Sequence, residues 1–242
     1  MSETKNIERA ARQLLEMEEF FAGDFVRKSP KPLIVAENVR DDGSAAGLEE
    51  IVSQAAACRQ CGLSETRTNI VAGEGNPDAR IVFVGEAPGA DEDACGRPFV
   101  GRAGQLLEKI IGAMGFDRSE IFICNILKCR PPGNRDPKPE EIIRCLPFLQ
   151  RQLELIRPEV IIALGAHAAR TLLNTNSPIG QLRGRFHDYY TSDDAEPIKL
   201  MPTYHPAYLL RNYSKENRQR VWDDVKKVLL ELDLPVPESN KQ

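Results

Sequence analysis

Short runs of consecutive apolar residues alternate with longer segments of helical periodicity along most of this chain. The apolar runs that are candidates for buried strands are residues 81–84, 121–124 and 160–164, and a further strand is expected near residues 198–201. The segments with apolar positions at helical spacing are residues 104–114, 139–156 and 215–232. Strands that alternate with helices form parallel sheets through right-handed crossovers. The pattern therefore predicts an α/β fold with three α/β/α layers and a central, mainly parallel sheet.

The first fifty residues follow a different pattern. Residues 5–21 place Ile7, Leu14 and Phe21 on one face, which predicts an amphipathic helix. Residues 28–47 contain SPKP, DDGS and AAG with little periodicity, as is typical of a linker. We therefore predict an N-terminal helix and flexible linker at 1–47 and the main domain at 48–242. The helix is a candidate binding site for an unidentified protein partner.

Composition and charge narrow the class of protein. The net charge of −4 over 242 residues excludes a uniformly basic surface, although local clusters of lysine and arginine can still hold phosphates. No apolar run approaches the roughly 20 residues that span a bilayer. The polar, acidic N-terminus does not have the basic-then-apolar order of a secretory signal. These features predict a cytoplasmic protein with no membrane partner.

Parallel α/β sheets bind ligands beyond the carboxyl ends of their strands, so residues there are the first candidates for a site. The first predicted strand is followed by GEAPG and, a few positions on, by GRPFVG. Such a loop lets the backbone approach a flat ligand closely. It does not end in the Gly-Lys-Ser/Thr of a phosphate-binding P-loop. Glu86 and the acidic run from Asp91 to Asp93 could instead bind a metal ion, or the run could be solvated surface.

Two further strand ends carry polar side chains. Asn125 follows the second strand, where its amide could pair with a base edge that carries adjacent C=O and N–H groups, or simply form a turn. His205 follows the last strand, within PTYHPAYLLR. We expect structural roles for the other two histidines, because His167 opens a predicted helix and His187 begins a predicted strand.

The six cysteines are better explained as ligands or buried residues than as disulfides, given the predicted cytoplasmic location. Cys58 and Cys61 precede the first strand, while Cys129 and Cys145 flank the segment RPPGNRDPKPEEIIR. Four thiolates suit either structural zinc or a [4Fe–4S] cluster, and their spacing alone leaves both possible. Of the other two cysteines, Cys124 is an expected core residue and Cys95 has no assigned role.

Taken in order, GEAPG with PFVG, then CNILKCRPPGNR, then TYHPAYLL resemble the motifs of the family-4, iron–sulfur uracil-DNA glycosylases. The resemblance covers the chain from about residue 58 to its end. It implies a monofunctional hydrolase that flips uracil out of single- or double-stranded DNA, cuts the N-glycosidic bond and leaves an abasic site for base excision repair. It also implies a [4Fe–4S] cluster on the four cysteines, and we expect a monomer. The implied uracil-binding residues are Gly85, Glu86, Ala87, Phe99, Asn125 and His205.

The implied roles suit the chemistry of the bond. Phe99 would stack on the extruded base, and Asn125 would pair with its edge. His205 would donate a hydrogen bond to O2 as negative charge develops there. Related families carry a water-positioning aspartate where this chain, like family 4, has Ala87. Glu86 is the candidate for that catalytic task.

Candidates for contacts with DNA directly follow His205. An apolar side chain among Tyr208, Leu209 and Leu210 could fill the gap left by the flipped nucleotide, with Arg211 on a phosphate. The same stretch could instead be the first turn of a helix that packs on the core. Basic residues of the cysteine-flanked loop that could meet phosphates are Arg130, Arg135 and Lys138.

Two other classes of function are open at this point. One is a metal-dependent nuclease or phosphohydrolase that uses Glu86 and the carboxylates from Asp91 to Asp93. The other is a non-catalytic DNA-binding module that contains a metal cluster. Release of free uracil that is insensitive to chelators would separate the glycosylase from both.

Overall fold

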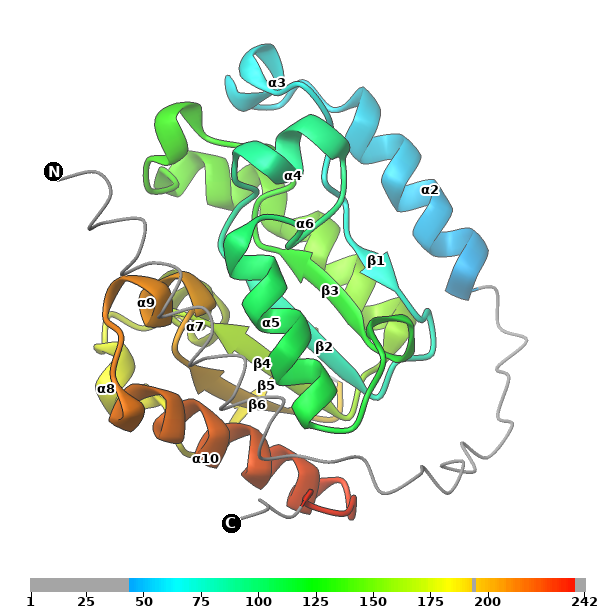
Figure 1. Ribbon diagram of the computed structural model, residues 1–242. Helices are drawn as coiled ribbons and strands as arrows, with labels where there is room; N and C mark the ends of the chain where they lie inside the picture. The colour runs from blue at the N-terminus through cyan, green and yellow to red at the C-terminus, as the bar shows by residue number, and fades with distance from the viewer. Residues whose placement is uncertain (1–43, 193–194, 238–242) are drawn as a thin grey trace, which may run out of the picture.

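The computed structural model describes residues 44–192 and 195–237, so the predicted helix at 5–21 lies outside the described residues. Within them, six strands form one sheet in the order β1-β3-β2-β4-β6-β5. Helices lie on both faces of this sheet (Figure 1), which confirms the predicted three-layer α/β/α fold. No helix of the described part is long and apolar enough to cross a membrane.

The described elements follow the predicted alternation closely. The strands are β1 (Glu74–Gly75), β2 (Ile81–Gly85), β3 (Phe122–Asn125), β4 (Val160–Leu164), β5 (His187–Tyr189) and β6 (Ile198–Thr203). The α-helices are α2 (Ser44–Ala57), α3 (Leu63–Thr66), α4 (Ala90–Cys95), α5 (Arg102–Ala113), α6 (Pro139–Ile156), α7 (Ala166–Leu173), α8 (Ile179–Leu182), α9 (Pro206–Arg211) and α10 (Lys215–Glu231). The sequence pattern did not predict the two-residue β1 or the short α4.

The four central strands, β3, β2, β4 and β6, are parallel, and the edge strands β1 and β5 are antiparallel. In the β2–β3 register Gly85 is opposite Asn125, and in the β4–β6 register Leu164 is opposite Thr203. The carboxyl ends of the parallel strands therefore meet at one edge of the sheet. The loops that follow them carry the predicted site residues.

Alternate residues of each central strand pack against different helical layers. Ile81 and Phe83 of β2 belong to a core that includes α5 and α10, whereas Val82 and Val84 belong to a second core that includes α2, α6 and α7. Continuous apolar runs are what a sheet buried on both faces requires. The runs found in the sequence thus reflect burial on both faces.

Helix α2 extends across the predicted boundary at residue 48. Helix α2 starts at Ser44, inside the segment predicted as flexible linker, and it packs along α6. The Ser44 hydroxyl donates to the carbonyl of Leu155, and Gly47 lies so close to Leu155 that a Cβ there would meet that side chain at 2.8 Å. Residues 44–47 are part of the helix because burying Leu48 and Ile51 fixes the preceding turn.

We expect Ile51→Ala to lower the free energy of unfolding by about 2–5 kcal/mol, because Ile51 is fully buried between α2 and the core. Val52, the next residue, is 40% exposed, so Val52→Ala is the matched control and should change stability by less than about 0.5 kcal/mol. Urea unfolding curves of the three proteins test this. Equal midpoints for the two variants would show that α2 is not an integral part of the domain.

Candidate active site

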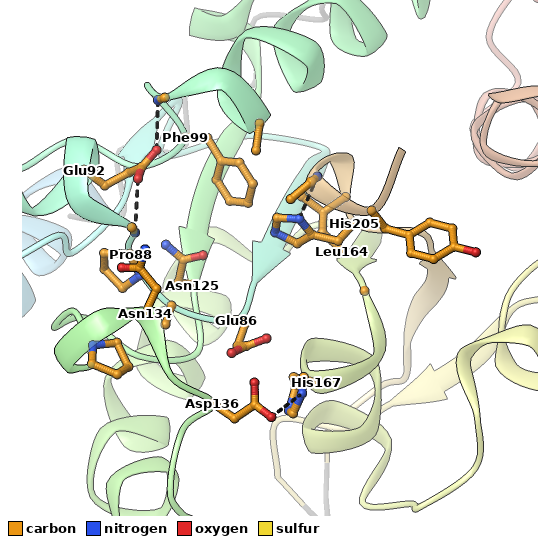
Figure 2. A pocket seen from close by; sticks show the side chains of 18 of the residues that line it. Glu86, Pro88, Glu92, Phe99, Asn125, Asn134, Asp136, Leu164, His167 and His205 are labelled. Atoms are coloured by element: carbon orange, nitrogen blue, oxygen red, sulfur yellow. Dashed lines mark hydrogen bonds and ion pairs between the residues drawn. The ribbon is translucent and has the colours of Figure 1, made fainter. Parts of the chain in front are cut away.

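A pocket of about 600 Å³ opens at the carboxyl ends of the parallel strands. Five of the six predicted uracil-binding residues line it; the sixth, Gly85, lies directly beneath them. Figure 2 shows Phe99, Asn125 and His205 on the upper side of this pocket and Glu86 below them. The structure therefore brings together side chains from three strand ends, as the sequence predicted.

Asn125 is the polar centre of the pocket. Its side chain is 2% exposed, and its Oδ1 atom is buried without a hydrogen-bond partner. A buried acceptor without a partner is costly in a folded protein. Gly85 makes the arrangement possible, because a Cβ at this position would lie 2.3 Å from Asn125 Oδ1 and 2.6 Å from Phe99 Cζ. Asn125 is thus prepared to accept a hydrogen bond from a ligand beside the Phe99 ring.

Phe99 is held in place by a strained backbone. Its φ angle is +50°, in the left-handed region that non-glycine residues rarely adopt. Arg118 donates to the carbonyls of Pro98 and Phe99 and also to Glu74, and these bonds fix the turn. Gly104 of α5 passes so close that a Cβ would meet the Phe99 carbonyl oxygen at 1.9 Å. The ring is therefore a rigid wall of the pocket.

His205 is fixed as a neutral hydrogen-bond donor. Its Nδ1 accepts from the backbone N–H of Ala207 at 3.0 Å, so the ring proton is on Nε2. Burial lowers the pKa of His205 to about 4, with a further lowering by Arg211 and an opposing effect of Glu92. The bonded edge of the ring faces α9, and the other edge faces the pocket (Figure 2). Nε2–H is thus available to a ligand over the physiological pH range.

The predicted cluster of four carboxylates does not converge on a metal. Glu92 accepts from the backbone N–H groups of Gly89, Val100 and Gly101 and so joins the two loops that follow β2. Asp93 is buried and accepts from the backbone of Thr68 at 2.9 Å. Short helix α4 turns these side chains toward backbone amides. The interpretation of Glu86 and Asp91 to Asp93 as a metal site is therefore wrong. The interpretation of Glu92 and Asp93 as solvated surface is also wrong.

Glu86 instead lies beside two residues that the sequence analysis did not assign to the site, Asp136 and His167. One ligand atom from each of the three lies within 4.8 Å of the others, and His167 Nε2 is 3.7 Å from Asp136 Oδ2. Burial raises the pKa of the Glu86 carboxyl, while His167 lowers it and Asp136 raises it. Figure 2 shows the three at the lower side of the pocket. This trio could hold a divalent cation or pass a proton between pocket and solvent.

The sequence analysis expected a structural role for His167, and the structure places its side chain at the lining of the pocket. His167 begins the helix after β4, which is itself a strand end, so the rule that located Asn125 and His205 also indicates it. Asp136 directly follows the motif CNILKCRPPGNR, in the segment between Cys129 and Cys145. His187 does have a structural setting, because its ring bonds to the carbonyl of Leu182.

The candidates for DNA contacts divide into buried and accessible residues. Leu209 is 1% exposed within the core, so it cannot enter DNA and that prediction is wrong. Tyr208 and Arg211 line the pocket, and Leu210 packs half-buried against the core. Helix α9 turns every third or fourth residue inward, and Leu209 occupies the inward position.

Arginines of the loop between β3 and α6 are partly engaged within the protein. Arg135 donates to both carboxylate oxygens of Glu141, whose own side chain caps the start of α6. Arg130 donates to Asn134, which lines the pocket. Both arginines shape this loop, and Arg135 also lines the pocket.

The four predicted ligand cysteines lie together. Cys58, Cys61, Cys129 and Cys145 line one small cavity of about 20 Å³. Burial raises the pKa of the Cys145 thiol to about 11. The backbone N–H of Lys128 points at Cys145 Sγ and Arg67 Nη1 at Cys129 Sγ, at 3.2 and 3.1 Å. Four sulfurs with N–H donors around them fit a thiolate-bound metal centre.

The two remaining cysteines differ from these four. Cys124 is fully buried in the second core, as predicted, and Cys95 is exposed at the end of α4.

Known proteins are similar in sequence to most of this chain. A family model described as the uracil DNA glycosylase superfamily matches residues 72–226. The type-4 uracil-DNA glycosylase of Thermotoga maritima is 49% identical over 182 residues, which are 74% of this chain and 92% of that protein. The corresponding protein of Archaeoglobus fulgidus is 45% identical over 185 residues, 75% of this chain and 91% of that protein. A type-5 uracil-DNA glycosylase of Pyrobaculum aerophilum is 31% identical over 150 residues, 56% and 64% of the two chains. This chain therefore belongs to the uracil DNA glycosylase superfamily and, within it, to the type-4 uracil-DNA glycosylases.

Proposed function

We propose that this protein hydrolyses the N-glycosidic bond of deoxyuridine in single- or double-stranded DNA, releasing uracil and leaving an abasic site for base excision repair. The observation that carries the proposal is a matched pair of polar groups beside the Phe99 ring. One is the buried Asn125 Oδ1, an acceptor without a partner, and the other is the Nε2–H donor of His205. Uracil offers the complement, a donor at N3 and an acceptor at O2.

Asn125 distinguishes uracil from cytosine. Uracil carries a proton on N3, which can donate to Asn125 Oδ1, whereas neutral cytosine has only a lone pair at N3. A cytosine in the same position would leave Oδ1 without a partner and oppose it with a second acceptor, which is strongly unfavourable in a buried site.

His205 stabilises the leaving group. As the C1′–N1 bond breaks, its electron pair moves onto uracil, and negative charge grows on O2. A donor fixed in advance in a water-poor pocket stabilises this charge without reorganisation, and such a donor is commonly worth about 10²–10³ in rate. Because the imidazole is neutral, Nε2–H stays on the nitrogen and uracil leaves as an anion.

Glu86 is the group that we assign to the attacking water. The water oxygen bonds to C1′ as the bond to N1 breaks, and its proton must reach a base. The Glu86 carboxylate, whose pKa is raised by burial, is a stronger base than an exposed one. His167 and Asp136 extend from it to the solvent. No lysine is among the described residues that line the pocket, so strand cleavage through a Schiff base is not expected.

Residues at the mouth of the pocket are assigned to DNA. Arg211 is exposed beside the pocket and suits a phosphate, and Tyr208 or Leu210 could fill the gap in a duplex after the base leaves. Arg130 and Arg135 are further phosphate candidates. We propose a monomer that works in the cytoplasm; the predicted N-terminal helix would add a protein contact outside the described residues.

The four-cysteine site supports a [4Fe–4S] cluster, which would act as a structural support for the loop between β3 and α6. Zinc is the other metal for four thiolates, and it would hold their sulfurs within about 3.8 Å of one another. The choice of the cluster over zinc rests on the similarity of this chain to the type-4 uracil-DNA glycosylases.

His205→Ala should lower the single-turnover rate of uracil release at least tenfold, because the donor acts on charge that develops in the transition state. DNA affinity should change little. Asn125→Ala should also slow release, and His187→Ala, outside the pocket, is the control. Quenched-flow assays with a uracil oligonucleotide measure the rates. Rates near wild type for both pocket variants would place the site elsewhere.

Protonation of His205 should not cause a loss of activity with a midpoint near pH 6.5. Its pKa of about 4 keeps the imidazole neutral as the pH drops from 8 to 5. Stability should respond instead: the unfolded chain takes up a proton below about pH 6.5 and the folded chain does not, so stability falls between 6.5 and 4. Titration of the histidine ring signals by NMR checks both points. A His205 signal that titrates near 6.5 contradicts the assignment.

The chain purified without oxygen should be brown and carry about four irons and four sulfides. Cys58→Ser and Cys145→Ser should lose iron together with stability. Cys95→Ser, at the exposed cysteine outside the cavity, should keep both and serves as the control. Metal analysis and visible absorption measure the content. A colourless, active protein with one zinc would overturn the cluster.

A further inference from the structure

Lys128 is a buried lysine that the proposed mechanism does not use. Its side chain is 1% exposed, between the pocket and the four-cysteine site. The ammonium donates to the main-chain carbonyl of Asn125 at 2.9 Å and to Gln152 Oε1 at 2.6 Å. Both acceptors are neutral oxygens, and burial lowers the pKa of the Lys128 amine. A polar amine buried in place of an apolar residue requires a reason.

The side-chain amine of Lys128 contacts the main chain of Asn125. The carbonyl that receives the ammonium belongs to the residue whose Oδ1 faces the pocket without a partner. Asn125 is the last residue of β3, and the peptide that follows it is held on both sides: the Ile126 N–H donates to the Gly85 carbonyl at 2.9 Å, and the Asn125 carbonyl accepts from Lys128. Lys128 thus closes a short loop onto this plane and adds a second anchor to the backbone from which the Asn125 side chain leaves.

The other end contacts the cysteine site. The backbone N–H of Lys128 donates to Cys145 Sγ, and the next residue is Cys129. Of the two thiols that raise the pKa of the Lys128 amine, Cys145 is a predicted ligand and Cys124 is a core residue.

The same residue connects the segments that carry the cysteines. Its carbonyl accepts from the backbone N–H of Val71, and Gln152 donates in turn to the carbonyl of Ala72. Gln152 and Cys145 both belong to α6. The contacts of Lys128 therefore join the strand end at Asn125 to the segment before β1 and to α6.

We propose that Lys128 is a positioning residue that couples the four-cysteine metal centre to uracil recognition by holding the main chain at Asn125. This inference rests on the proposed function. The metal centre would then contribute to base recognition as well as support a loop. Its cysteine ligands would keep Lys128 in place, and Lys128 would orient the side-chain amide of Asn125.

Lys128→Met tests the proposal, because methionine is apolar and fills much of the same space. The expected result is a single-turnover rate at least about tenfold lower and inhibition by free uracil weakened by a similar factor, as for the loss of a charged hydrogen bond. Iron content, visible absorption and affinity for uracil-free DNA should stay within about twofold of wild type.

Gln152→Met is the matched control, since it removes the second acceptor and leaves the bond to Asn125. It should lower the melting temperature without weakening inhibition by free uracil. If both variants lose stability and uracil inhibition alike, Lys128 is only a structural residue and the proposal is wrong. Wild-type inhibition by uracil in a folded, iron-loaded Lys128→Met protein would also overturn it.

Lys128→Gln guards against failure of the methionine variant to fold, because glutamine still offers an N–H to the Asn125 carbonyl. It should fold and keep part of the uracil inhibition. If neither variant folds with iron bound, the role is structural and the proposal fails. The wild-type protein distinguishes failure of the proposed function from failure of the proposal for Lys128. If the wild type neither releases uracil from DNA nor is inhibited by uracil, the proposed function fails, whatever the Lys128 variants do.

Discussion

The end of β2 at Gly85 is the point on which the pocket depends, because three groups need the same space there. The parallel register places Asn125 opposite Gly85, and the loop after α4 returns Phe99 over both. Any side chain at this position would overlap the Asn125 amide and the Phe99 ring. A second strand-end glycine, Gly165, has a φ of +92° and leaves only 2.9 Å between a hypothetical Cβ and that of His205. The polar groups converge because the backbone at these two strand ends carries no side chains.

Electrostatic conditions in the pocket follow from how each group is held. The Glu92 carboxylate accepts hydrogen bonds from three backbone N–H groups and so holds together the loops that line the pocket. His205 is kept neutral by burial and by the Ala207 amide, which fixes its tautomer. Glu86 retains an accessible carboxylate near His167. The same local sequence thus supplies one carboxylate that is bound by backbone amides and one that lies beside His167 and Asp136.

The sequence allowed the fold and the three strand-end residues to be predicted, because buried parallel strands have continuous apolar runs and their ends share one edge. The role of Glu92 could not be predicted, since it depends on α4 turning the side chain toward Val100 and Gly101. Leu209 was misassigned because a six-residue helix has too few positions to show which face is buried. The start of α2 was missed for a related reason: Ser44 and Gly47 lie against Leu155, more than a hundred residues away, and local sequence does not show such a contact.

The strained turn at Phe99 explains how such a pocket can bind a base that must first leave its stack. A positive φ at a non-glycine residue costs on the order of 1–3 kcal/mol, and it persists only when the surroundings fix it. Here Arg118, itself paired with Glu74, holds the carbonyls of Pro98 and Phe99, and Gly104 lets α5 approach. The free-energy cost of this strained backbone is part of folding and does not recur when a base binds. An incoming base then meets an aromatic wall, an acceptor and a donor that are already in place, so binding need not order them. Extrusion from DNA costs a few kcal/mol, and a rigid pocket leaves more of its interaction energy to offset that cost.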